Sequence, residues 1–279
     1  MNGQDLSNSL YALAVLDCKD PAYAPAVVQL AAECKRRDFT GLTPQGLSNS
    51  AWALAKLGHN SDQGWFAAVV AAAMRPNVTK GLTAQNLSNL WYGLALMRHR
   101  PGPAFVEGTA AASEVLRTGT GGQECANLLW SLATLEVPYE PRLVGVLVER
   151  LEELLPQRGA VSDQHLTTSL WALAVMGPGV LSRHQRPMEV LLREVVRRWD
   201  QPAAAAVDEG SSGSGRLNAA NLCQLWRVQQ ELELADGCSR LVGIMAGGGG
   251  AGSRVSLLSA MRHAASKGGA ETDGRPEDR

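Results

Sequence analysis

One thirteen-residue pattern occurs five times in this chain, and it constrains the fold more than any other feature of the sequence. The copies read QDLSNSLYALAVL, QGLSNSAWALAKL, QNLSNLWYGLALM, QECANLLWSLATL and QHLTTSLWALAVM, and they begin at Gln4, Gln45, Gln85, Gln123 and Gln164. They align without gaps at spacings of 41, 40, 38 and 41 residues. Tetratricopeptide and ankyrin repeats recur at about 34 and 33 residues, so this period excludes both. The chain is therefore expected to be a tandem array of one small unit.

The residues inside the pattern have the spacing of an amphipathic helix. With the Gln as position 0, apolar residues recur at +2, +6, +9, +10 and +12, which is a helical and not a strand period. An aromatic residue at +7 is expected to bridge neighbouring repeats more readily than to stack on a base. Two residues before the Gln, four copies carry side chains typical of a helix N-cap: Asn2, Thr43, Thr83 and Ser162.

A second amphipathic segment follows each pattern after a short turn, as at 141–155 and 186–199. One such hairpin cannot enclose its own apolar stripe, but stacked neighbours can cover one another. The sequence therefore predicts an all-α fold, a right-handed α-solenoid of stacked helix-turn-helix repeats of about 38–41 residues.

Composition divides the chain into four parts. Residues 1–200 hold the five tandem repeats, and 201–216 form an Ala-, Gly- and Ser-rich insertion that we expect to be flexible. Residues 217–245 are interpreted as a degenerate sixth helical unit. The Gly-rich, charged tail at 246–279 is expected to be disordered.

The sequence shows no recognisable catalytic or targeting signal. The five histidines are scattered, and no metalloprotease, nucleophile-elbow or P-loop motif is present, so we expect no enzyme activity, cofactor or metal site. Five cysteines without a CxxC pair fit a reducing compartment. No apolar run of membrane-spanning length and no transit peptide is visible, so no membrane contact is expected.

The motif Asn-x-x-Trp-x-Leu-Ala-x-Leu, seen at Asn49–Leu57 and at Asn127–Leu135, resembles the octotricopeptide repeats of green-algal organellar proteins. These are related to the repeats of FAST-kinase-like proteins, and the resemblance covers most of residues 1–200. A RAP domain often follows the repeats in this family, and we expect none in this chain. The resemblance implies sequence-selective binding of single-stranded RNA in RNA stabilisation, processing or translation. It also implies a chloroplast or mitochondrial location and, as partners, an organellar transcript and other RNA-processing proteins.

Three positions on the helical wheel, +1, +4 and +8, face away from the apolar stripe and suit base recognition. Position +8 is small in every copy, which would leave room for a planar base, and an Asn amide at +4 both donates and accepts hydrogen bonds. Position +1 differs in every copy, as a base-reading position would. The alternative is structural: first-turn capping at +1 and contacts between repeats at +4. The candidate RNA-binding residues are Asp5, Asn8, Gly46, Asn49, Asn86, Asn89, Glu124, Asn127, His165 and Thr168.

Basic residues gather near the ends of the second helices. The net charge of −1 provides no general attraction for a polyanion, so a local basic rim would have to contact the phosphates. The alternative is that cations at helix C-termini answer the helix dipole. The candidate phosphate contacts are Lys35, Arg36, Arg37, Arg75, Arg117, Arg197 and Arg198.

Two classes of function remain open on this sequence. The near-neutral charge favours a helical-repeat scaffold that binds a protein or peptide partner. The motif match and the stripe of Asn and small residues favour an RNA-binding repeat protein, which is the preferred interpretation.

Overall fold

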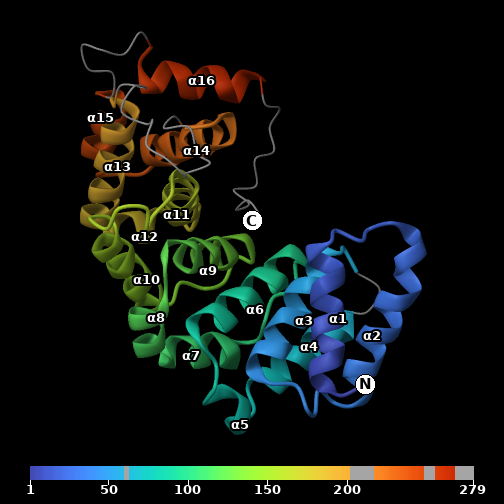
Figure 1. Cartoon of the computed structure of the whole chain (residues 1–279). Coiled ribbons are helices and arrows are strands. Elements are labelled where there is room, and N and C mark those ends of the chain that lie inside the picture. The colour runs from blue at the N-terminus through green and yellow to red at the C-terminus, as the bar shows by residue number, and fades with distance from the viewer. Residues whose placement is uncertain (60–62, 202–216, 248–254, 268–279) are drawn as a thin grey trace. The chain divides into compact units, whose positions relative to one another are not determined.

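The computed structural model describes residues 1–59, 63–201, 217–247 and 255–267, and every regular element in these ranges is a helix (Figure 1). The predicted all-α fold of helical repeats is therefore confirmed. Each copy of the thirteen-residue pattern forms one helix, here called an A helix, which begins one residue before its Gln. The A helices are α1 (Gly3–Val15), α3 (Pro44–Lys56), α6 (Ala84–Leu96), α9 (Gly122–Thr134) and α11 (Asp163–Val175).

The predicted N-caps explain where the A helices begin. The side chains of Asn2, Thr43, Thr83 and Ser162 each accept a hydrogen bond from the backbone N–H three residues on. This bond satisfies one of the N–H groups that the first helical turn leaves without a partner.

The second segment of each repeat also forms helices, called B helices here, and proline commonly stands at their first position. A proline there loses no helical hydrogen bond and has the backbone φ that a helix needs. The B helices are α2 (Ala24–Arg36), preceded by the 3-10 turn η1 (Pro21–Tyr23), α4 (Gln63–Ala73) with α5 (Pro76–Thr79), α7 (Pro103–Ala111) with α8 (Ser113–Gly119), α10 (Pro141–Leu154), and α12 (Pro178–Arg183) with α13 (Gln185–Trp199).

The C-terminal part differs from the prediction at one helix. The expected sixth unit forms α14 (Ala219–Leu234) and α15 (Ser239–Ala246), but the tail predicted to be disordered contains α16 (Leu257–Lys267). Helix α16 packs against α14 and buries Leu257 and Met261, which lie one turn apart on the same helix face. Residues 202–216 of the predicted insertion, and 248–254 and 268–279 of the tail, lie outside the described residues.

The chain divides into two compact units. The first comprises residues 1–120 and 134–147, and the second comprises 121–133 and 148–279. In the first unit, consecutive A helices α1, α3 and α6 form the most extensive contacts. In the second unit, α14 lies between α11 and α16, and α15 packs against α13.

The core consists of the apolar positions of the pattern. The side chains at +2 and +6 are at most 3% exposed in all five A helices, because they face the B helix and the neighbouring A helices. Tryptophans connect the two kinds of helix: Trp65 Nε1 donates to the carbonyl oxygen of Ala31 (2.9 Å), and Trp91 Nε1 donates to Thr109 Oγ1 (3.1 Å). At +7, the rings of Tyr11 and Trp52 lie 5.4 Å apart, which confirms the expected aromatic bridge between these two repeats.

Candidate nucleic-acid interface

The variable residues at +1 complete the caps of their own helices. In four A helices, the +1 side chain accepts a hydrogen bond from the backbone N–H of the residue three before it, at 2.7–3.2 Å. Gly46 is the exception, because it has no side chain to offer. Very different side chains satisfy this one geometric requirement, namely Asp5, Asn86, Glu124 and His165. Variation at +1 therefore has a structural explanation that involves no ligand.

The residues at +4 differ strongly in exposure. Asn8 is exposed, and Asn49 and Asn89 are half-buried, with Asn89 Nδ2 donating to Asn49 Oδ1 (3.4 Å). Asn127 is only 8% exposed, and Thr168 is fully buried. Amides that face solvent at +4 therefore belong to the first three repeats, and the two later candidates pack inside the second unit.

Position +8 does not provide room for a base in the described repeats beyond the first. Ala53, Ser131 and Ala172 are fully buried, whereas only Ala12, in the first repeat, is exposed. A Cβ atom added at Gly93 would lie 3.0 Å from the carbonyl oxygen of Ala51. The small residues at +8 thus allow adjacent A helices to approach closely. In these four repeats, the expectation that they leave space for a ligand is wrong.

The solvent-facing stripe of the A helices instead begins at position 0. The glutamines at this position are exposed in the first four repeats and half-buried in the fifth. Residues at 0 and +4 stand one turn apart on the same helix face, so the glutamine and asparagine side chains are neighbours. The sequence contained a signal for this stripe, because the same polar residue opens all five helices at a position that the caps do not use.

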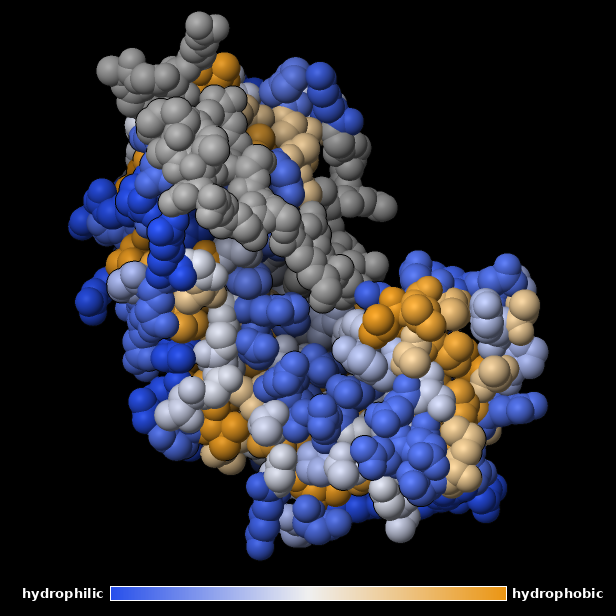
Figure 2. Space-filling model, in the orientation of Figure 1, coloured by the Kyte–Doolittle hydropathy of each residue, from blue (hydrophilic) through white to orange (hydrophobic). Residues whose placement is uncertain are grey.

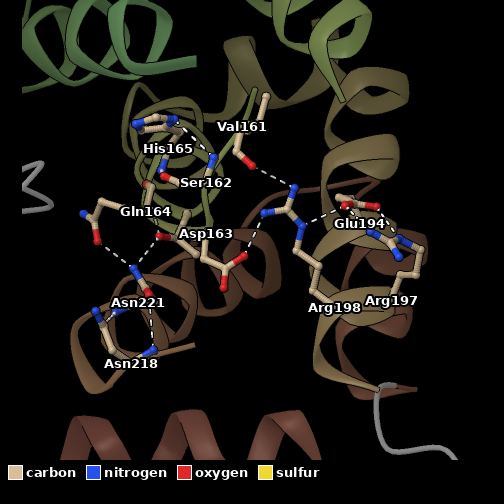
Figure 3. Close-up of polar contacts among 11 residues, drawn as sticks. Val161, Ser162, Asp163, Gln164, His165, Glu194, Arg197, Arg198, Asn218 and Asn221 are labelled. Atoms are coloured by element: carbon tan, nitrogen blue, oxygen red, sulfur yellow. Dashed lines mark hydrogen bonds and ion pairs between the residues drawn. The ribbon is translucent and has the colours of Figure 1, made fainter. Parts of the chain in front are cut away.

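In the second unit, the corresponding polar residues bond to one another between α11 and α14 (Figure 3). Asn221 Nδ2 donates to Gln164 Oε1 (2.7 Å), and Thr167 Oγ1 donates to Gln224 Oε1 (2.7 Å). Gln224 Nε2 in turn donates to Thr168 Oγ1 (3.3 Å). We call these five residues the polar seam; they hold two helices together.

Two of the basic clusters have the same construction, Glu-x-x-Arg-Arg at the end of a B helix. Glu33 accepts hydrogen bonds from Arg36 and Arg37, and Glu194 accepts them from Arg197 and Arg198 (Figure 3). The second arginine of each pair also donates to the carbonyl oxygen just before the N-cap of its own repeat. Arg37 binds Met1 O and Arg198 binds Val161 O, both at 2.9 Å.

Each of these clusters therefore contains one arginine that bonds to the backbone of its own repeat and one that faces solvent. Arg37 and Arg198 fasten the end of the B helix to the start of the A helix, and Arg198 also pairs with Asp163 at 2.7 Å. The side chains of Arg36 and Arg197 are 69% and 56% exposed, so they face solvent even while paired with a glutamate.

Arg75 and Arg117 form ion pairs outside these two clusters. Arg75 donates to the carbonyl oxygen of Asp38 (2.7 Å) and pairs with its carboxylate (2.6 Å), linking α4 and α5 to the preceding loop. Arg117 pairs with Glu114 within α8 (2.7 Å), and Lys35 is exposed. Paired arginines of this kind keep unused N–H donors, but their position is set by the fold.

The glutamates of the two clusters make stability depend on pH. Hydrogen bonds from Arg36 and Arg37 lower the pKa of Glu33 to about 2, and those from Arg197 and Arg198 lower the pKa of Glu194. A carboxyl whose pKa is lowered by folding stabilises the native state above its unfolded pKa, about 4.3, and loses this contribution as pH falls toward the folded pKa.

We therefore expect the double variant Glu33→Gln/Glu194→Gln to lose less stability than the native chain when pH is lowered from 5 to 3. Urea denaturation midpoints at the two pH values measure the difference. Glu107→Gln, which changes an exposed glutamate of α7, is the control and should follow the native chain. Equal losses in the double variant and the native chain would show that these ion pairs contribute nothing to acid stability.

Among the described residues, no group of three or more His, Cys, Asp or Glu side chains is arranged to hold a metal ion. No helix in the described ranges combines the length and the apolar character needed to cross a membrane.

Comparison with known proteins identifies the family. Residues 1–178, which contain all five copies of the pattern, match the family model described as the Tbc2 translation factor, N-terminal domain. The search of curated proteins gave no significant match. Because the matched segment covers more than half of the chain, this chain belongs to the Tbc2 translation factor N-terminal domain family.

Proposed function

We propose that this chain binds single-stranded RNA with sequence selectivity and acts in the translation, stabilisation or processing of an organellar transcript. Two observations support the proposal: the family is named for a translation factor, and the repeats resemble octotricopeptide repeats. Both also support a location in an organelle, with the chloroplast as the first choice. The role is binding and not catalysis, and other RNA-processing proteins are the expected protein partners.

The observation that carries the proposal is a row of amides on the first unit. Gln4, Gln45 and Gln85 are exposed at position 0 of consecutive A helices, and Asn8, Asn49 and Asn89 stand one turn further on. Packed helices have axes about 8–10 Å apart, so the same amides recur at regular steps along the row. Each amide offers both donors and an acceptor to a base edge, and single-stranded RNA exposes these edges.

Base recognition is assigned to the glutamines at position 0 and the asparagines at +4 of the first three repeats, and not to the residues at +1. Asp5 and Asn86 already accept a hydrogen bond in their caps, and Gly46 lacks a side chain. Asn127 and Thr168 are assigned to packing because they are buried. Base selectivity is thus assigned to three repeats, which corresponds to a short motif.

Selection from a pool of randomised single-stranded RNA tests the proposal. We expect the native chain to enrich a short motif and Gln45→Ala/Gln85→Ala to bind it more weakly, because each good amide contact with a base contributes about 1–3 kcal/mol of discrimination. Gln29→Ala is the matched control, since it removes an exposed glutamine from the B helix α2. Failure of the native chain to enrich any motif, or enrichment that the double variant leaves unchanged, would contradict the proposal.

A second candidate, a scaffold for a protein partner, is favoured by one observation. The outer face of the first repeat is apolar and exposed, as the hydrophobic side chains gathered over α1 and α2 show (Figure 2). Val15, Leu16 and Tyr11 are 54%, 74% and 42% exposed there. In the same selection, Leu16→Ser should leave the RNA motif unchanged. Absence of RNA enrichment together with binding of a defined protein that depends on Leu16 would support the scaffold instead.

A further inference from the structure

The surface between α13 and α15 in the second unit contains a hollow lined by arginines. Its volume is about 510 Å³, and its lining includes Arg193 and Arg197 from α13 and Arg240 from α15. Gly243 forms part of the lining, and the space that a Cβ atom would occupy at this glycine is open. A ligand can therefore approach both the guanidinium groups and the backbone of α15.

Two glutamates, Glu189 and Glu194, bind these arginines and fix their positions. Glu189 Oε1 accepts hydrogen bonds from Arg193 (2.9 Å) and Arg240 (2.7 Å), and Glu194 binds Arg197. The glutamate side chains are 17% and 14% exposed, whereas the three arginine side chains are 56–73% exposed. The carboxylates are thus more buried than the guanidinium groups, which face solvent and keep unused N–H donors.

Positive charge exceeds negative charge at this place. Four arginines, the three above and Arg198, share two glutamates, and Arg198 also binds Asp163. Four positive charges against three negative ones leave one positive charge in the cluster, on a chain whose net charge is −1. Preorganised arginines with spare donors suit the oxygens of a phosphate group.

A second hollow shares the two arginines of α13 with the first. Arg193 and Arg197, one helical turn apart, also line this second hollow of about 510 Å³, together with Glu194, Leu155, Pro156 and Val190. In Figure 2, hydrophilic side chains follow the edge formed by α13. Two hollows that share a pair of arginines fit an extended polyanion better than a single small ion, because consecutive charges can occupy both.

We propose that the surface formed by Arg193, Arg197 and Arg240 binds the phosphodiester backbone of single-stranded RNA without reading its bases. This inference rests on the proposed function and adds to it a second, sequence-independent contact on the second unit. Arg198 is not part of this surface, because it fastens α13 to the start of α11.

The salt dependence of RNA binding tests this inference. We would measure the affinity of the full chain for a uridine 20-mer and for the selected RNA between 50 and 300 mM salt. The variant is Glu189→Gln/Arg193→Gln/Arg240→Gln, which removes two arginines without leaving their shared carboxylate unpaired. Each lost phosphate contact should reduce the slope of log K against log salt by about 0.7, so two contacts should reduce it by about 1.4.

Arg227→Gln on α14 is the matched control, because it changes the net charge of the chain by the same −1 and lies outside both hollows. Its slope should stay close to that of the native chain, and thermal unfolding should show that both variants are folded. An unchanged slope in the triple variant overturns the inference. Binding of poly-glutamate in place of the uridine 20-mer, in an Arg193-dependent manner, also overturns it.

The two RNA proposals fail in different ways. Gln45→Ala/Gln85→Ala should lose preference for the selected motif and keep the native slope of log K against log salt. The triple variant should keep the preference and show a reduced slope. Motif selection with an unchanged slope in the triple variant leaves the proposed function intact and removes only the arginine surface. A native chain that binds neither RNA overturns both.

Discussion

Gly93→Leu is expected to destabilise the first unit by about 1–2 kcal/mol. Gly93 occupies position +8 of α6, and an added Cβ alone would lie 3.0 Å from the carbonyl oxygen of Ala51 and 3.2 Å from the backbone nitrogen of Trp52. Overpacking a close helix contact costs about 1–3 kcal/mol, occasionally more. Removing a glycine from the helix returns only about 1 kcal/mol, so a leucine that must separate α3 from α6 gives a net loss.

Urea and thermal unfolding followed by circular dichroism measure this loss. Ala12→Leu is the matched control, because Ala12 occupies the same position +8 but is exposed. Its effect should stay within about 0.5 kcal/mol, as for most surface substitutions. If both variants were as stable as the native chain, position +8 would face solvent in α6 too, and the first interpretation of this position as space for a base would be restored.

Gln224→Leu should destabilise the second unit by about 1–3 kcal/mol. Gln224 is 2% exposed, accepts a hydrogen bond from Thr167 Oγ1 and donates one to Thr168 Oγ1. A leucine of similar size fills the space but removes two buried hydrogen bonds, each of which contributes about 0.5–1.5 kcal/mol. Thr167 and Thr168 keep their hydrogen bonds to Asn221 and Gln164. The measurement is the free energy of unfolding from urea denaturation.

A double-mutant cycle with Thr167→Val distinguishes the hydrogen bond from simple packing. Removing both partners should cost less than the sum of the single losses, with a coupling energy of about 1 kcal/mol, because neither buried group is then left without the other. Additive losses would mean that the bond between Thr167 and Gln224 contributes nothing. The residues of the polar seam would then be available for a ligand after all.

The contrast between the two units follows from these contacts. In the first unit, the glutamines and asparagines at 0 and +4 face solvent or are half-buried. In the second unit, Gln164 and Thr168 bond with α14. The same repeat pattern therefore produces an accessible amide row in one unit and a polar seam in the other.

The basic clusters show where local reasoning ends. The pairing of Glu33 with Arg36 and Arg37 follows from their spacing of three and four residues on one helix. The bond from Arg37 to Met1 O joins residues 36 apart and depends on how the B helix returns along the A helix. Helix spacing alone therefore cannot separate arginines that face solvent from arginines that bond to the backbone elsewhere in the repeat.

The sequence by itself determined the A helices, their starts and their buried Leu and Ala positions, because periodicity and capping depend on residues within a few positions of one another. Only the tertiary structure decided which flank of each A helix meets its neighbour. A helical wheel shows that +8 and position 0 lie off the apolar stripe, but the packing of successive helices buries Gly93 and exposes Gln85. For the same reason the sequence predicts disorder where α16 forms, since Leu257 and Met261 are buried only when the helix packs against α14.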